Sequence, residues 1–387
     1  MELRKKNIHM EETRCTASTQ IALEEDIIVL DHNPDVSKII YEKGLIKLDE
    51  IKTSKDQVQV KGKITFAILY LASNESRQIY TMSGGVSFDE TIYMEGVQTG
   101  DFVQLHKELE GLTINMINPR KLSVQSLISF AVSLDDVRDV ESGSELIVNE
   151  DVVCKNQNIE VAEIVMQKKD VFRMKEETEL PKNYANILNV LWEEITMGEV
   201  EFKALDEKVL VQGEAKLFLL YECEGEEVVL RFYETTIPYN GTIDCLGCRE
   251  HMVLDVDYQV EHAELEIRPD FDGEERVITV DVALDLLVKL YQETTEEILE
   301  DAYGITREVV PVKEKAMVKS LVANNTGRCK VIERVKIKQS LPRIMQLCHS
   351  NGEVQLDDVV LTEEGIELSG IVKAKILYVT SDDMQPY

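Results

Sequence analysis

Long apolar runs are missing from this sequence, and cysteines are few. The longest apolar runs are short, such as Phe66–Ala72. Their length is far below the ~18 residues that a membrane-spanning helix needs. Seven cysteines, an odd and sparse number, argue against a disulfide framework and favour a reducing compartment. The first residues, Met1–Cys15, are charged and lack the apolar centre of a secretory signal. We therefore expect a cytosolic location.

Basic residues are also scarce in comparison with acidic ones. The chain has 42 Lys and Arg against 73 Asp and Glu, which gives a net charge of -31. Such a chain repels the phosphates of nucleic acids and anionic membranes. Its partners are expected to be proteins, cations or cationic surfaces, although the same acidity also serves solubility alone.

The common catalytic motifs do not occur in the sequence. There is no Gly-rich phosphate loop, no Walker lysine and no G-x-S-x-G nucleophile motif. The histidines are scattered without the spacing of metal ligands. The sequence therefore predicts a protein that is not an enzyme, with no cofactor and no metal site.

One strand pattern recurs three times along the chain. Apolar residues alternate with polar ones from Val58, Val209 and Ile366, which is typical of a half-buried β-strand. A glycine lies on the apolar face of each copy, where we expect a bulge or a close backbone approach. Each glycine precedes a tyrosine by eight residues: Gly62 and Tyr70, Gly213 and Tyr221, Gly370 and Tyr378.

The similarity extends beyond this strand in both directions. A Pro-containing start with a brief helical pattern precedes each copy, from Leu30, Leu180 and Leu341. Later strands also match, as at Arg120 and Arg276. Each repeat therefore reads as one short helix followed by about six or seven strands with polar turns. The predicted class is mainly β with minor α, as tandem β-sandwiches or partly open barrels.

These repeats divide the chain into tandem domains rather than solenoid repeats. The last copy stops soon after Tyr378, so we expect the sequence to break off inside a third repeat. The predicted segments are a lead-in strand region at 1–29, a first domain at 30–139, a strand-like connector at 140–179, a second domain at 180–292, a strand-like connector at 293–340, and the truncated start of a third domain at 341–387.

Together these features resemble the SPOCS domain, which occurs in tandem in sporulation proteins of endospore-forming bacteria. The resemblance rests on the Pro-containing start, the strand V-x-G-x-x-x-x-x-x-L-Y, the later Ile237–Tyr239 and the R-x-V-x-V strand at Arg276. It implies a non-enzymatic structural protein of the endospore coat, located in the mother-cell cytoplasm at the forespore surface. The implied role is a protein–protein interaction scaffold that helps to localise the coat.

The resemblance also implies a set of partners. Coat morphogenetic proteins of this family carry a C-terminal LysM domain that binds the coat-anchoring ATPase SpoIVA, and this sequence contains no LysM segment. The implied partners are other spore coat proteins, with SpoIVA only through that missing domain. Self-association is a further expectation, whereas binding to nucleic acid and insertion into a membrane are not expected.

The motif Cys245–Cys248 allows a redox-active pair or half of a zinc site, for which His251 or His262 could be recruited. The repeat offers a plainer interpretation, because Met94 and Val97 take the same positions in the first copy. Free cysteines often behave as small buried hydrophobic residues. A thiol- or zinc-dependent enzyme that uses Cys245 and Cys248 stays open as an alternative function.

Two further features have a structural and a functional interpretation. The carboxylate-rich segment Glu264–Glu275 could bind a divalent cation loosely, but it lacks the order of an EF-hand loop and is more simply a solvated acidic loop. Trp192 is most simply a core residue that packs beside Ile187, Leu188 and Leu191. A surface on which a sugar stacks is the less favoured interpretation. A carbohydrate-binding β-module is therefore a second alternative.

One basic stretch, Arg328–Arg343, interrupts the acidic sequence and contains a single acid, Glu333. Like charges along one face repel each other unless acids lie opposite. Either neighbouring acidic strands of this chain supply those acids, or an acidic surface of another subunit or coat protein does. The candidate interaction surface is the basic face of the predicted strand, formed by Arg328, Lys330, Arg334, Lys336 and Lys338, with Cys329, Val331, Val335 and Ile337 mainly on the other face.

Overall fold

The computed structural model describes residues 2–73, 78–147, 152–223, 229–324, 327, 329–339, 341–363, 365–380 and 387. In these ranges the regular structure is entirely β-strand, and no helix is long and apolar enough to span a membrane. The strands are β1 (Glu2–Ile28), β2 (Val36–Ser54), β3 (Gln57–Ala72), β4 (Ile79–Tyr93), β5 (Gln104–Asn118), β6 (Lys121–Ile147), β7 (Val152–Glu179), β8 (Ile187–Leu205), β9 (Lys208–Cys223), β10 (Val229–Asp244), β11 (Val253–Pro269), β12 (Glu275–Gly304), β13 (Ile344–Leu361) and β14 (Ile366–Thr380).

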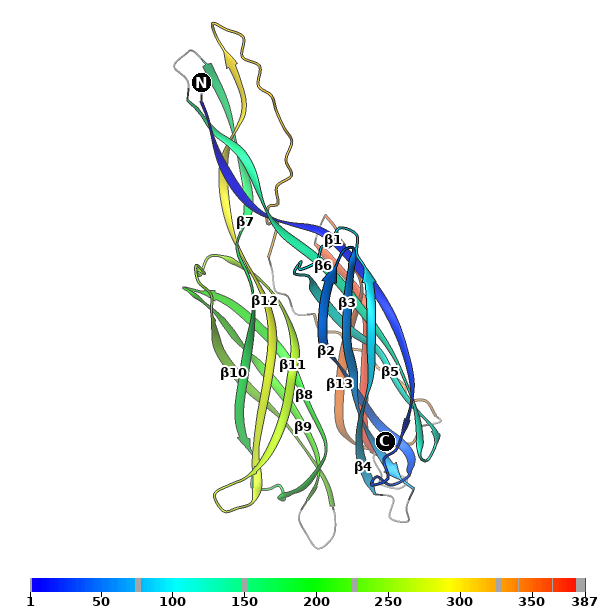
Figure 1. The fold of residues 1–387 in the computed structure, drawn as a ribbon. Coiled ribbons are helices and arrows are strands. Elements are labelled where there is room, and N and C mark those ends of the chain that lie inside the picture. The colour runs from blue at the N-terminus through cyan, green and yellow to red at the C-terminus, as the bar shows by residue number, and fades with distance from the viewer. Residues whose placement is uncertain are drawn as a thin grey trace.

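Four three-stranded antiparallel sheets form two sandwiches (Figure 1). In the first sandwich the sheet β2-β3-β4 packs on β1-β6-β5, and in the second β10-β9-β8 packs on β11-β12-β7. The alternating apolar residues of the strands meet between the two sheets, as the period of a half-buried strand requires. The predicted mainly-β class is confirmed, and the sheets do not close into barrels.

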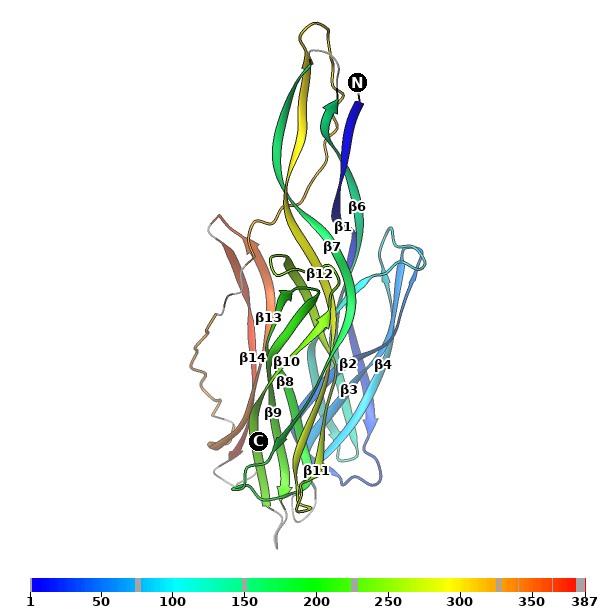
Figure 2. The same cartoon turned by 90° about the vertical axis from the view of Figure 1, so that its left-hand side faces the viewer.

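The lead-in strands belong to the sandwiches. β1 pairs with β6 along almost its whole length, and β7 pairs with β12 in the same way. The first and last strands of each sandwich are therefore neighbours in one sheet. The far ends of these four strands extend past the sandwiches as a stalk (Figure 2), where Ile8, Met10 and Val161 pack together.

The predicted short helices are wrong. At Leu30, Leu180 and Leu341 the chain instead makes a tight turn and enters β2, β8 or β13. The turn is closed in each copy by a backbone hydrogen bond between residues three apart, such as Asn33 N to Leu30 O at 2.9 Å. The same turn in all three copies marks the start of each repeat.

A β-bulge produced the helix-like spacing. The register between β8 and β9 shifts between Val190 and Trp192, so Leu191 is an extra residue in the ladder. Val190 packs against the core of the second sandwich, whereas Leu191 and Trp192 pack on the outer face of the sheet. A bulge breaks the two-residue period, and burial on both faces then gives apolar residues at spacings that a helix would also show.

The recurring glycine has the expected cause. A Cβ atom on Gly62, Gly213 or Gly370 would lie 2.3 Å from a carbonyl oxygen of the neighbouring strand. Such a contact is far shorter than atoms tolerate, so only glycine fits where the two backbones approach. The predicted close backbone approach is confirmed in all three repeats.

The recurring tyrosine fastens each strand to the turn at the start of its repeat. The hydroxyl groups of Tyr70, Tyr221 and Tyr378 each donate a hydrogen bond of 3.2 Å to a backbone carbonyl, those of Pro34, Ala185 and Pro342 respectively. Each carbonyl precedes its tyrosine by the same number of residues. The third repeat therefore begins in the same register as the other two.

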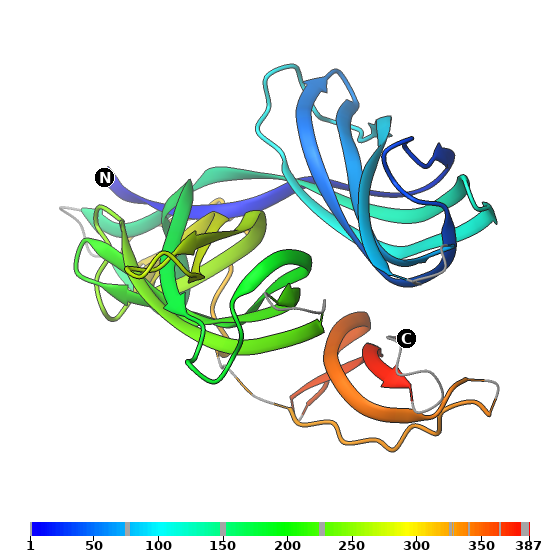
Figure 3. The same cartoon turned by 90° about the horizontal axis from the view of Figure 1, so that it is seen from below.

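The third repeat consists of one hairpin in the described chain. β13 and β14 form a two-stranded sheet that corresponds to β2-β3 and β8-β9. Residues 305–339 contain no strand where they are described. Seen from below, the two sandwiches and this third-repeat hairpin surround a common centre (Figure 3).

Candidate interaction surfaces

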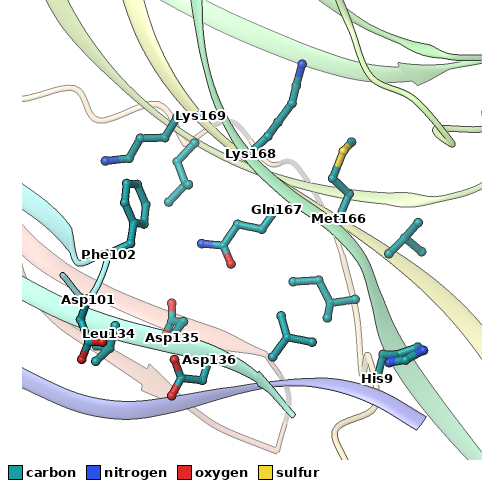
Figure 4. Close-up of a pocket in the computed structure, with 14 residues that line it drawn as sticks. His9, Asp101, Phe102, Leu134, Asp135, Asp136, Met166, Gln167, Lys168 and Lys169 are labelled. Carbon is teal, nitrogen blue, oxygen red and sulfur yellow. The ribbon is translucent and has the colours of Figure 1, made fainter. Parts of the chain in front are cut away.

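An open groove of about 820 Å³ lies between the first and second sandwiches. Figure 4 shows Asp135 and Asp136 of the first sandwich on one wall, and Lys168 and Lys169 of β7 on the other. The Lys169 ammonium lies 4.1 Å from the centre of the Phe102 ring, a cation–π contact that joins the two walls. The groove is thus bridged at its edge by the protein itself.

The charged side chains of this groove are bound to other residues of the chain. Arg14 pairs with Asp101 and, at 2.9 Å, with Asp136, while Lys168 Nζ lies 2.6 Å from Asp170 Oδ2. Polar groups that already have partners are poorly placed to orient a substrate. The groove has the character of a contact between sandwiches rather than of an active site.

A buried ion cluster lies deeper in the same contact. Lys289 of β12 lies 2.7 Å from Glu11 of β1 and 2.9 Å from Asp135 of β6, and the three side chains are only 6–12% exposed. Tyr291 Oη donates a 2.5 Å hydrogen bond to Glu11. Removing one member would leave an uncompensated buried charge. This cluster therefore fixes the second sandwich against the first.

Hydrogen bonds offset the cost of burying these charges. Burial alone would raise the pKa of Asp135, but hydrogen bonds from Lys289 and Thr13 outweigh it and hold that pKa below its usual value. Burial would lower the pKa of Lys289, and hydrogen bonds to Glu11 and Asp135 raise it instead. Gln104 donates a further hydrogen bond to Asp135 at 2.8 Å. Asp135 and Lys289 are thus held in their charged forms.

A three-way cluster joins both sandwiches to the third-repeat hairpin. Tyr41, Trp192 and His349 occupy equivalent places, because each pairs with the leucine that precedes the recurring tyrosine. The outer faces of the three repeats thus pack around one another. The buried members of the three-way cluster are Tyr41, Leu69, Ile79, Leu191, Trp192, Phe218, Leu220, Cys348 and Leu377.

Aromatic contacts hold the centre of this cluster. The rings of Tyr41 and Trp192 meet edge to face with centroids 5.4 Å apart, and His349 stacks on Phe218 at 4.0 Å. The Lys43 ammonium lies 5.1 Å from the Trp192 ring. Such contacts are directional as well as apolar. They therefore fix the orientation of the three repeats.

Polar contacts also attach the hairpin to the second sandwich. His349 Nε2 lies 3.4 Å from Glu194, and the amide of Asn351 donates a hydrogen bond to the same carboxylate. Burial opposes the charged form of Glu194, but His349, Lys43 and Asn351 outweigh it and lower its pKa. Burial lowers the pKa of Lys43 itself. The base of the hairpin is therefore held by specific polar bonds in addition to apolar packing.

The inward face of the hairpin is uncovered. Ile366, Leu368 and Val372 of β14 are 64%, 62% and 53% exposed. In a β-sandwich such residues lie under a second sheet, which the third repeat does not have within the described ranges. The equivalent residues of β3 and β9 are all 0% exposed: Val58, Val60, Ile64, Val209, Val211 and Ala215.

The predicted basic surface shortly precedes β13 in the sequence, and its side chains are exposed. Lys330, Arg334, Lys336 and Lys338 are all exposed, and they form no ion pair within the described ranges. Arg328 lies outside the described residues. The stretch forms no strand where it is described, so neighbouring acidic strands of the chain do not pair with it there. Its role as an interaction surface stays a prediction.

Comparison with models of known protein families identifies the repeated unit. A model of the family "SipL, SPOCS domain" matches residues 35–117 and 186–268. The chain carries two tandem SPOCS domains of the SipL type. The two matches cover β2–β5 and β8–β11. Searches among curated proteins and among solved structures found no significant match.

The SPOCS family is associated with sporulation, and this indicates a sporulation-related role for the chain. Each SPOCS match ends before the long strand, β6 or β12, that completes its sandwich. The family model does not extend to β13–β14. Their assignment as a third repeat rests on the shared turn, the shared glycine contact and the shared tyrosine bond.

The motif Cys245–Cys248 lies in the second SPOCS match and forms a tight turn. The amide of Cys245 donates to Glu207 O, and Cys248 O accepts from Glu207 N, both at 2.9 Å. In the first SPOCS copy Met94 and Val97 make the same pair of bonds with the residue at the corresponding position. The cysteines therefore fill the structural positions that apolar residues fill in the other copy.

The environment of these thiols opposes nucleophilic chemistry. Both cysteines are 0% exposed. Burial, together with the neighbouring Cys248, raises the pKa of Cys245 to about 11. A reactive cysteine needs the reverse shift, because the thiolate is the nucleophile and the metal ligand. The structural interpretation therefore accounts for the motif without chemistry.

The acidic segment Glu264–Glu275 joins β11 to β12 through a turn. Asp270 Oδ1 accepts hydrogen bonds from the amides of Asp272 and Glu274, at 2.9 and 3.0 Å. This bonding is that of an aspartate-capped turn. Across the described residues, no three His, Cys, Asp or Glu side chains lie close enough to hold a metal ion.

Two features of these surfaces were not identified from the sequence. Lys289 lies in an apolar run and resembles an ordinary exposed lysine, because its partners Glu11 and Asp135 lie far away in sequence. The three-way cluster had one signal, the apolar residues on both faces of β2 and β8, which were interpreted as helix. The equivalence of Tyr41, Trp192 and His349 could have been found by aligning the three repeats.

Proposed function

We propose that this protein is a non-enzymatic structural and assembly protein of the bacterial endospore coat. It acts as a protein–protein interaction scaffold that helps to localise coat at the forespore surface, in the mother-cell cytoplasm. The SPOCS family supports the sporulation role. The observation that carries the scaffold role is the basic face at Lys330, Arg334, Lys336 and Lys338, which is exposed and forms no ion pair within the described ranges.

The exposed basic stretch supports a binding role. Lys330, Arg334, Lys336 and Lys338 are exposed and form no ion pair within the described ranges. In a chain with a net charge of -31, such a stretch attracts an acidic surface of a partner protein.

The fixed arrangement of the repeats also suits a scaffold. The ion cluster at Lys289 and the three-way cluster at Trp192 set the relative positions of the two sandwiches and the hairpin. Surfaces held in a fixed arrangement can present several partners at defined distances. We assign contacts with other coat proteins to these surfaces. The family resemblance assigns the contact with SpoIVA to a LysM domain, and not to these residues.

The test is the placement of the coat in sporulating cells. In an endospore-forming host, deletion of the protein should leave coat material away from the forespore. A variant with Lys336→Glu and Lys338→Glu should fail to restore placement while keeping the circular dichroism of the native chain. The control is Lys208→Glu, which reverses the charge of an exposed residue of β9 in the second sandwich. A deletion strain that places its coat normally would overturn the proposal.

A further inference from the structure

The outer face of each repeat reaches a ring side chain of the next repeat. Lys43 of the first repeat lies 5.1 Å from the centre of the Trp192 ring in the second. Glu194 of the second repeat lies 3.4 Å from His349 in the third. Lys43 and Glu194 are equivalent, because each follows the ring residue of its own repeat, Tyr41 or Trp192, by two positions. The first two junctions between repeats therefore use the same place in the fold.

The third repeat closes the series by contacting the first. The Lys375 ammonium lies 6.0 Å from the centre of the Tyr41 ring and donates a 3.3 Å hydrogen bond to Glu42 O. Lys375 takes the place of Phe218, which stacks on His349, because both precede the leucine of the three-way cluster by two positions. The contacts thus run from first to second, second to third and third to first. The repeats form a closed ring with head-to-tail junctions (Figure 3).

The junction between the second and third repeats has its own chemistry. His349 lies between two carboxylates of the second sandwich, 3.4 Å from Glu194 and 3.7 Å from Glu234. Asn351 of the third repeat donates a hydrogen bond to the same Glu194. A second sandwich in this place would bring Trp192 and another Glu194 instead, and like charges at a buried site repel. The face at Glu194 therefore fits a third repeat and rejects a second one.

The members of the ring differ in how they are tied together. The buried ion cluster at Lys289 holds the first and second sandwiches to each other. The third repeat instead follows a linker, residues 305–343, which contains no strand where it is described and leaves the outer end of the stalk (Figures 1 and 2). An extended chain advances about 3.3 Å per residue, so this linker reaches up to roughly 130 Å. The third repeat is therefore the member that can change place between copies.

We propose that the outer faces of the two sandwiches form one composite site for a third repeat, and that this site also takes the third repeat of a second copy of the chain. Two copies that exchange third repeats make the same junctions as two separate copies, so exchange changes only the chain entropy. Because the ring is closed within one chain, a further copy joins by exchange and not by addition. The inference goes beyond the proposed function, since it assigns how copies of the chain join.

Tethering decides which third repeat fills the composite site. A group on a flexible tether has an effective concentration of about a millimolar or less. The chain's own third repeat therefore fills the site in dilute protein, and exchange competes only where copies are crowded together. We expect sedimentation equilibrium of the native chain to show a monomer at about 10 µM and a measurable fraction of dimer at about 1 mM.

A charge exchange between two full-length variants tests the composite site in dilute protein. His349→Glu places a carboxylate beside Glu194 and Glu234 of its own chain, so its third repeat should leave the site. Glu194→Lys gives a second chain a site that suits this altered repeat. Each variant alone should be a monomer, and the mixture should form a one-to-one dimer at least about tenfold tighter than either self-association. One exchanged junction then joins opposite charges, and the other is native.

The fluorescence of Trp192 reports docking, because this single tryptophan is 3% exposed in the three-way cluster. Its emission should shift to longer wavelength in His349→Glu and return when Glu194→Lys is added. Both changes in one chain should restore a monomer with native emission, which separates loss of docking from loss of folding. The matched control is Glu214→Lys, which reverses an exposed carboxylate of β9 and should give no dimer with His349→Glu.

A mixture of His349→Glu and Glu194→Lys that stays monomeric would overturn the inference, because the site would then accept only the chain's own third repeat. An unshifted Trp192 emission in His349→Glu, or an equal dimer with the Glu214→Lys control, would also overturn it. The native chain gives a test that needs no substitution, since a strict monomer at about 1 mM excludes exchange. If exchange fails while the deletion strain still misplaces its coat, the scaffold function stands without it.

Discussion

Lys289 Nζ lies 2.9 Å from Asp135 Oδ2, across the contact between the two sandwiches. Replacing Lys289 by Met should lower the free energy of unfolding by about 3–5 kcal/mol, because two carboxylates would remain buried without a cation. The two sandwiches should then melt in separate calorimetric transitions. Lys155→Met, which removes an exposed pair with Glu300, should cost less than about 1 kcal/mol. Equal effects of the two changes would contradict this role.

The same cluster should make the contact sensitive to acid. The pKa of Asp135 is lower in the folded protein than in the unfolded chain. Its contribution to stability is therefore complete above the unfolded value of about 4 and is lost as the pH falls through the lower, folded value. Thermal unfolding of the native chain and of Asp135→Asn should differ at pH 7 and converge below pH ~3. A constant difference across this range would show that the charge of Asp135 is irrelevant.

Gly213 should not tolerate a side chain. A Cβ atom there would lie 2.3 Å from the carbonyl oxygen of Glu199 and 2.6 Å from the Tyr239 hydroxyl. We expect Gly213→Ala to lower the free energy of unfolding by about 3 kcal/mol or more. Gly111→Ala, with nothing within 4 Å of the added atom, should change it by less than about 1 kcal/mol. Denaturant titration measures both changes.

Leu377 should hold the hairpin in the three-way cluster. It is 1% exposed, and Leu377→Ala should cost about 2–5 kcal/mol of local packing energy. Trp192 is the chain's single tryptophan and lies in this cluster, so its fluorescence should shift to longer wavelength as water enters. Leu368→Ala changes a 62% exposed leucine of the same strand and should leave the emission unchanged. An unshifted spectrum for Leu377→Ala would show that the hairpin is held elsewhere.

The cysteine thiols should fall into a fast-reacting group and a slow-reacting group. Cys154 and Cys329 are exposed, whereas Cys245 and Cys248 are fully buried. A disulfide reagent at pH 8 should modify the exposed pair quickly, and it should reach the buried pair only after unfolding. Cys154→Ser with Cys329→Ser should remove the fast phase. Rapid modification of Cys245 in the native chain would revive the thiol-enzyme alternative.

The fold class followed from local patterns, which is why the sequence predicted it well. Alternation around Gly62, Gly213 and Gly370 specified strands, and the repeated spacing specified tandem units. The helices were predicted wrongly where Leu191 and its equivalents form a bulge whose two faces are both buried. Burial on the outer face comes from contacts between repeats, which no window of one repeat contains.

The candidate surfaces were less predictable for the same reason. The charge of the basic stretch at Lys330–Lys338 is visible in the sequence. The exposure of the apolar side chains of β14 is not visible there. Ile366 and Val58 look alike in sequence and differ only in what lies over them. Lys289 and Glu11 are brought together by packing between sandwiches. Such contacts depend on the arrangement of whole units, which a single sequence does not reveal.

The long strands of the stalk have a mechanical consequence. β6 and β12 run without interruption from the sandwich cores into the stalk, paired along their length with β1 and β7. A pull along the stalk would shear many backbone hydrogen bonds together instead of opening them one at a time. The molecule should therefore resist stretching along this axis and yield far more easily when a hairpin is peeled sideways.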